Sequence, residues 1–95
     1  MKSGPLRFLG YDWKILVTER SKYLGTDDAG YSFKTKTIYI RKSIPHTEQM
    51  SALYHELHHI IIDHFRLVIP EEERVVLTLE NSMMAVIRDN GLDFR

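Results

Sequence analysis

The spacing of hydrophobic residues along the chain changes near residue 45. Before this point, apolar and polar positions alternate over residues 6–19, and residues 31–33 and 37–40 are rich in β-branched and aromatic residues; both patterns are typical of β-strands. A polar bend interrupts each stretch, near Gly10 in the first and at residues 34–36 in the second. We therefore predict two hairpins between about residues 6 and 42. The inward-facing candidates of the first hairpin are Phe8, Trp13, Ile15 and Val17.

After Pro45 the apolar positions recur every three or four residues, which is the period of a helix. One run starts at Thr47, a candidate N-cap residue. A second run follows Pro70, and the three glutamates after this proline suit the positive end of a helix dipole. We predict helices at about residues 47–66 and 70–89.

Strands followed by helices predict an α+β fold, in which a small antiparallel sheet packs against two helices on one of its faces. The chain has 95 residues, and we expect residues 1–95 to form a single domain. The link between the two helices is short, so we expect the helices to run antiparallel.

Composition and charge exclude several classes of function. Lysine plus arginine and aspartate plus glutamate number 13 each, so no net field attracts nucleic acid or an anionic membrane. No apolar run is long enough for a signal peptide or a membrane span, and we expect the protein in the cytoplasm. The chain has no cysteine, which leaves histidine and carboxylate as the strong ligands for a metal such as Zn²⁺.

The first predicted helix contains the sequence His-Glu-Leu-His-His at residues 55–59, which fits the pattern H-E-x-x-H. Side chains four residues apart lie on one face of a helix, so His55 and His59 can bind the same zinc ion. Glu56 lies beside them and can act as general base toward a zinc-bound water. The pattern therefore predicts a zinc-dependent peptidase.

Catalytic zinc usually has three protein ligands, so a third ligand must come from outside the motif. Asp63 continues the histidine stripe but lies about 6 Å further along the helix, beyond the reach of a shared ion. Glu80 lies among apolar neighbours, where a carboxylate needs a partner, and an antiparallel helix pair brings it toward the histidines. Glu73 lies two turns earlier on nearly the same face, and we rank it second because the helix start already explains an acidic residue.

With Glu80 on the following helix, this motif resembles that of the gluzincin metallopeptidases. As a whole, the sequence is similar to the minimal members of this group and to the short H-E-x-x-H proteins of phage and bacterial genomes. The residues that carry this similarity are roughly 31–90. The resemblance implies that zinc is held by two histidines and a glutamate and that Glu56 polarises the bound water. The implied ligands are His55, His59 and Glu80.

The resemblance also implies an edge strand above the zinc ion, and residues 37–40 are similar to this strand. An extended peptide or protein substrate would dock beside them by adding a strand to the sheet. We expect no nucleic acid or membrane partner.

Two alternatives to a peptidase stay open. One is a non-catalytic phage or regulatory interaction module, in which structural zinc stabilises a metallopeptidase scaffold. Glu56 argues against this alternative, because a structural zinc ion needs no free carboxylate beside it. The other alternative is a zinc-dependent hydrolase of a non-peptide amide.

Overall fold

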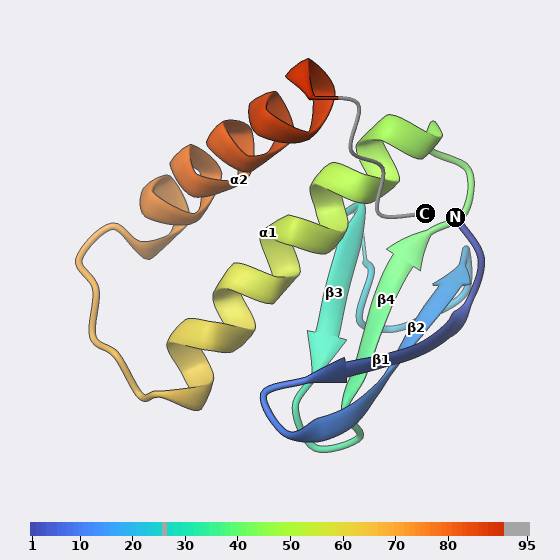
Figure 1. The fold of residues 1–95 in the computed structure, drawn as a ribbon. Coiled ribbons are helices and arrows are strands. Elements are labelled where there is room, and N and C mark those ends of the chain that lie inside the picture. Colours follow the sequence, from blue (N-terminus) through green and yellow to red (C-terminus); the bar gives the residue numbers. More distant parts are fainter. Residues whose placement is uncertain (26, 91–95) are drawn as a thin grey trace.

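The chain forms a four-stranded sheet followed by two helices (Figure 1). A computed structural model describes residues 1–25 and 27–90. The α+β class predicted from the sequence, with a small sheet and two helices, is confirmed. In chain order the elements are β1 (Gly4–Phe8), β2 (Tyr11–Thr18), β3 (Ala29–Ser32), β4 (Thr37–Arg41), α1 (His46–His64) and α2 (Glu72–Asp89).

The sheet is mixed rather than wholly antiparallel. Its strand order is β1-β2-β4-β3, with β2 and β4 parallel and the two outer pairs antiparallel. The two predicted hairpins, β1–β2 and β3–β4, both form, but they join each other through β2 and β4. The expectation of an antiparallel sheet therefore fails for this central pair, because alternation does not encode the relative direction of two strands.

Residues with left-handed backbone conformation set several boundaries of the elements. Leu9 (φ 52°) and Gly10 (φ 79°) form the two-residue turn between β1 and β2. Arg66 (φ 54°) follows the end of α1, and Glu71 (φ 54°) directly precedes α2. As a result, α1 ends two residues before the predicted position and α2 begins two residues after it. Neither of these described helices is both long and apolar enough to cross a bilayer.

The hydrophobic core lies between the sheet and α1. Of the four inward-facing candidates, Trp13 and Ile15 are in this core, while Phe8 and Val17 pack against it and are partly buried. The core positions follow from period-two burial in the strands and the three-four spacing in α1. The buried members are Trp13, Ile15, Ile38, Ile40, Leu53 and Ile60.

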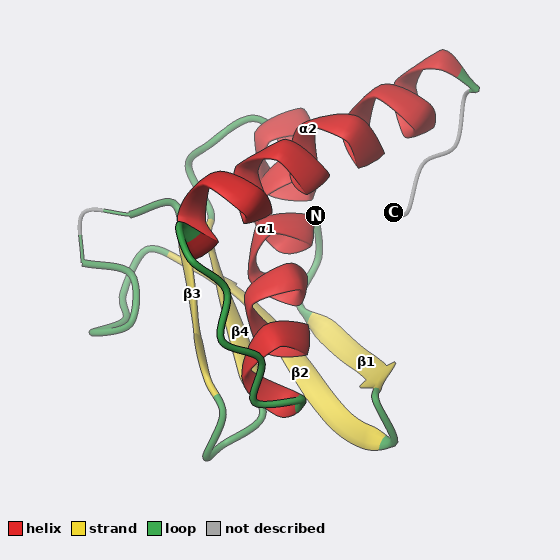
Figure 2. Ribbon diagram, turned by 90° about the vertical axis from the view of Figure 1, so that its left-hand side faces the viewer, coloured by secondary structure: helices red, strands yellow, loops and turns green. Residues whose placement is uncertain are grey.

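Helix α2 packs against α1 and not against the sheet (Figure 2). It returns toward the beginning of α1 and crosses that helix obliquely. Within its described residues, Val76 and Glu80 are the buried ones, so few apolar contacts hold α2 in place. The expectation that both helices cover one face of the sheet holds for α1 alone.

Tyr23 and Leu24, which follow β2 in the chain, pack at the face of the sheet opposite α1. Tyr39 alternates with the core residues Ile38 and Ile40, so its ring points to that opposite face. The ring of Tyr23 stacks on the ring of Tyr39 at a centroid distance of 4.8 Å, and Leu24 beside it is fully buried. These contacts position the beginning of β3.

Gly30→Ala is expected to destabilise the fold by about 1–3 kcal/mol. A Cβ atom at Gly30 would lie 2.1 Å from the carbonyl oxygen of Tyr23, a backbone atom that cannot rotate away. Gly4→Ala is the matched control, because a Cβ atom there meets nothing within 4 Å, and we expect a change below about 0.5 kcal/mol. Urea unfolding measures both variants, and equal unfolding midpoints would contradict the close approach of Tyr23 to β3.

Candidate metal centre

His55 and His59 extend from the same face of α1, as their four-residue spacing predicts. Their Nε2 atoms lie 3.2 Å apart, and the centroids of the two rings are 4.8 Å apart. Both side chains are mostly buried. The two nitrogens thus point to one common volume, as a shared cation requires.

Helix α2 brings Glu73 to the same volume. Its Oε1 atom lies 2.7 Å from Nε2 of His55, and its Oε2 atom lies 3.1 Å from Nε2 of His59. Ligand atoms around a tetrahedral zinc ion lie about 3.3–3.6 Å from one another, so small side-chain shifts suffice to fit an ion. Across the described part of the chain, one group of His and acidic residues has ligand atoms all within 4.8 Å of one another, and it consists of His55, His59 and Glu73.

Two further carboxylates contact the Nδ1 atoms of the two imidazoles. Nδ1 of His55 lies 2.6 Å from Oε1 of Glu80, and Nδ1 of His59 lies 2.6 Å from Oε2 of Glu72. Ser51 donates a hydrogen bond from its Oγ to Oε2 of Glu80 at 2.5 Å. A carboxylate that accepts the Nδ1 proton fixes the ring and leaves the Nε2 lone pair free for a metal. The donor set therefore fits a zinc ion on the Nε2 side.

Glu80 therefore does not lie at the position of the third metal ligand, where the sequence predicted it. It contacts His55 on the Nδ1 side, whereas Glu73 faces the Nε2 atoms of both histidines. Helix α2 crosses α1 obliquely (Figure 2), so Glu73 in the first turn of α2 lies at the Nε2 atoms, whereas Glu80, two turns later, lies at Nδ1 of His55. The geometry favours Glu73, ranked second from the sequence, over Glu80 as the third ligand.

The comparisons with known proteins give no match. No family model matches this chain, and neither does any curated protein or solved structure. We therefore infer the chemistry of the site from its own side chains alone.

Two residues of the site were not identified from the sequence. Glu72 was explained by the helix dipole alone, although its carboxylate contacts His59. Ser51 lies four residues before His55, so the same spacing that reveals the histidine pair could have placed its hydroxyl on this face of α1.

Glu56 lies next to the histidine pair and borders a cavity. The residue is 8 % exposed, and no described side chain forms a hydrogen bond with its carboxylate. Burial raises the pKa of this carboxyl above its ordinary value, an effect that His55 and His59 oppose and Glu73 reinforces. A raised pKa makes Glu56 a stronger base in its ionised form, as a general base requires.

In the metal-free protein, Glu56→Gln is expected to raise the melting temperature at pH 7. The Glu56 pKa is higher in the folded state, so the ionised carboxylate costs stability above that pKa, and the cost disappears as the pH falls below the ordinary value of 4.5. The stabilisation by glutamine should therefore shrink as the pH is lowered through this range. Thermal unfolding of the wild type and Glu56→Gln in EDTA, at pH 7 and at a pH below 4.5, measures the effect. A lower melting temperature of Glu56→Gln than of the wild type at pH 7 would contradict it.

A cavity of about 690 Å³ opens over the motif. The first three residues of β3, Ala29, Gly30 and Tyr31, line it together with one face of α1 and two glutamates of α2. Since β3 is an outer strand of the sheet, one of its sides has no strand partner among the described residues. The cavity is therefore a groove beside a free sheet edge.

The edge strand differs from the one expected at residues 37–40. That segment is β4, which pairs with β2 on one side and β3 on the other, so it cannot accept a further strand. The parallel pairing is the reason, because it joins the second hairpin to the sheet through β4 and leaves β3 outside. The expectation that residues 37–40 form the edge strand is therefore wrong, and the outer strand at the groove is β3.

Tyr31 adds a hydrogen-bond donor to the groove. Its hydroxyl donates to Oδ2 of Asp63 at 3.1 Å. Burial raises the pKa of this hydroxyl, and the negative charge of Asp63 raises it further, so Tyr31 stays protonated at neutral pH. Asp63 therefore contacts a side chain at the groove and lies outside the ligand group, as its spacing from the histidines predicts.

Proposed function

We propose that the protein is a zinc-dependent peptidase of gluzincin type that acts in the cytoplasm. The observation that supports this proposal is the convergence of His55, His59 and Glu73 beside the buried carboxylate of Glu56. Two imidazoles and one carboxylate are a ligand set of catalytic zinc, and they leave a fourth position open. A free carboxylate beside this position serves proton transfer and has no role in a structural zinc site.

Each side chain of the site has a separate role in the proposed reaction. The two histidines and Glu73 would hold the ion, and Glu72 and Glu80 would keep the imidazole rings oriented. A zinc ion held by these residues would supply Lewis acidity, which lowers the pKa of a water molecule to about 7 and polarises a carbonyl group. Glu56 takes the proton of the attacking water and passes it to the amine leaving group.

An extended peptide or protein segment is the substrate that fits the groove. The outer side of β3 offers backbone N–H and C=O groups that can pair with an added strand. Because Ala29, Gly30 and Tyr31 border the same cavity as the histidines, a peptide paired with β3 would run past Glu56. Strand addition would thereby bring a peptide bond to the site.

Metal analysis combined with a peptide screen tests the proposal. The purified chain is expected to bind one zinc ion, and His59→Ala is expected to lose it. The zinc-loaded chain should cleave members of a peptide library, and cleavage should stop in EDTA and return when zinc is restored. A chain that binds no zinc, or binds it and cleaves no peptide, would overturn the proposal.

A non-catalytic interaction module with structural zinc is the second candidate, and the packing of α2 favours it. The described residues of α2 contact no strand, and contacts between carboxylates and imidazoles hold much of this helix to α1. A zinc ion shared by the two helices would stabilise their docking. The two candidates differ in their need for Glu56, which only the peptidase requires.

A further inference from the structure

The groove over the motif is acidic although the chain as a whole is neutral. Lysine plus arginine equal aspartate plus glutamate at 13 each in the full sequence. The described residues that line the groove include no lysine or arginine. They do include six carboxylates: Asp27, Asp28, Glu48, Glu56, Glu73 and Glu80. Such a separation of charge favours a cationic ligand.

Three of the six carboxylates, Glu56, Glu73 and Glu80, lie at the candidate metal site, where the histidines and a metal ion would offset their charge. The other three are Asp27, Asp28 and Glu48, which we call the acidic rim. No described residue forms an ion pair with a carboxylate of the acidic rim. The charge of the rim is therefore available to a ligand in the groove.

The acidic rim lies where β3 and α1 begin. Asp27 and Asp28 directly precede β3, and Glu48 lies in the first turn of α1, two turns before His55. Figure 1 shows both elements starting in the upper half of the view. The seven residues from Glu48 to His55 span about 10 Å of helix, which is the length of about three residues of an extended peptide. A peptide paired with β3 would therefore place a side chain on the rim about three residues from the reacting bond.

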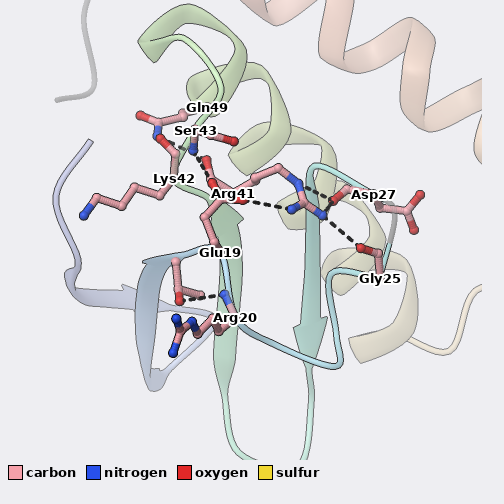
Figure 3. Close-up of polar contacts among 9 residues, drawn as sticks. Glu19, Arg20, Gly25, Asp27, Arg41, Lys42, Ser43 and Gln49 are labelled. Atoms are coloured by element: carbon pink, nitrogen blue, oxygen red, sulfur yellow. Dashed lines mark hydrogen bonds and ion pairs between the residues drawn. The ribbon is translucent and has the colours of Figure 1, made fainter.

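Arg41 holds the loop that carries Asp27 and Asp28 (Figure 3). Its guanidinium donates to the carbonyl oxygens of Gly25 and Asp27 at 3.0 and 2.7 Å, and to the carboxylate of Glu19 at 3.0 Å. The side-chain carboxylate of Asp27 points away from this guanidinium. Arg41 thus fixes the backbone of the loop and leaves the charge of the acidic rim uncompensated.

The carboxylate of Glu56 also indicates that the groove takes a ligand. The residue is 8 % exposed and borders the groove, and its carboxylate has no hydrogen-bond partner among the described residues, an arrangement typical of binding sites. We propose that the groove binds a peptide segment carrying lysine or arginine about three residues from the bond to be cleaved, with the acidic rim as the source of this preference. The inference rests on the proposed peptidase function for the position of that bond.

Peptide binding to the zinc-loaded Glu56→Gln chain tests the inference without cleavage. Fluorescent peptides of alanine and serine carry a single Lys, Gln or Glu that is moved along the sequence. We expect one Lys position to bind at least about 10-fold more tightly than Gln at low salt, and the difference to fall at high salt. Asp28→Asn and Glu48→Gln in this background should reduce the preference for Lys. Asp12→Asn, which removes an exposed carboxylate on the β1–β2 hairpin, should leave it unchanged.

The outcomes separate this inference from the function on which it rests. Equal binding of the Lys and Gln peptides would overturn the inference, and so would a Lys preference that persists in both rim variants. Cleavage by the wild-type chain is a separate readout. A rim-dependent Lys preference without cleavage of any peptide would support a basic ligand and overturn the peptidase, whereas cleavage without a basic preference would do the reverse.

Discussion

Glu56→Gln is expected to lower the rate of peptide hydrolysis by about 100- to 10,000-fold while zinc stays bound. Glutamine keeps the shape of the side chain but cannot accept the proton of the attacking water. Glu56 is not part of the group formed by His55, His59 and Glu73, so zinc affinity should change little. Initial rates on a cleaved peptide, measured beside the zinc content of the same sample, give both quantities.

Glu71→Gln is a suitable control for the hydrolysis experiment. Glu71 is an exposed carboxylate that pairs with Arg74 at 3.5 Å, and its replacement should leave the rate unchanged. If zinc-loaded Glu56→Gln hydrolysed peptide at a rate similar to that of the wild type, the role of Glu56 as general base would be untenable. An interaction module with structural zinc would then be favoured.

Glu73→Gln is expected to weaken zinc binding by more than about 100-fold, and Glu80→Gln by about 10- to 100-fold. Glu73 faces both Nε2 atoms, so its replacement removes a ligand from the metal itself. Glu80 contacts Nδ1 of His55, so its replacement disturbs only the orientation of one imidazole. Competition with a fluorescent zinc chelator measures the two affinities.

Glu71→Gln also serves as the control for this pair of variants. Glu71→Gln lies in the same region of the chain and should retain wild-type zinc affinity. A larger loss in Glu80→Gln than in Glu73→Gln would reverse the assignment and restore the ligand set expected from the sequence. Equal, small losses in both variants would contradict a site that takes its third ligand from α2.

The elements of the fold were predictable because their periods record which side of each element is buried. Alternation around Trp13 and Ile15, and the spacing of Leu53 and Ile60, identify side chains that meet in the core. The parallel pairing of β2 with β4 was not predictable in this way, since alternation is the same for either strand direction. This single pairing places β3 at the edge, and the docking position expected at residues 37–40 failed as a consequence.

The histidine pair was predictable because a helix fixes the relative position of residues four apart. The place of each α2 carboxylate depends instead on how α2 crosses α1, which is a property of tertiary packing. The expectation that Glu80 is buried and needs a partner is confirmed, and His55 and Ser51 meet this need. The oblique crossing, which the sequence does not reveal, is what brings Glu73 to the Nε2 side.

Anomalous diffraction at the zinc edge, from crystals of the zinc-loaded chain, tests the central claim most directly. We predict one peak between α1 and α2, about 2.0–2.2 Å from Nε2 of His55, Nε2 of His59 and a carboxylate oxygen of Glu73. Glu80 should remain on Nδ1 of His55. A peak at another place, or no peak between these three side chains, would contradict the proposed metal centre.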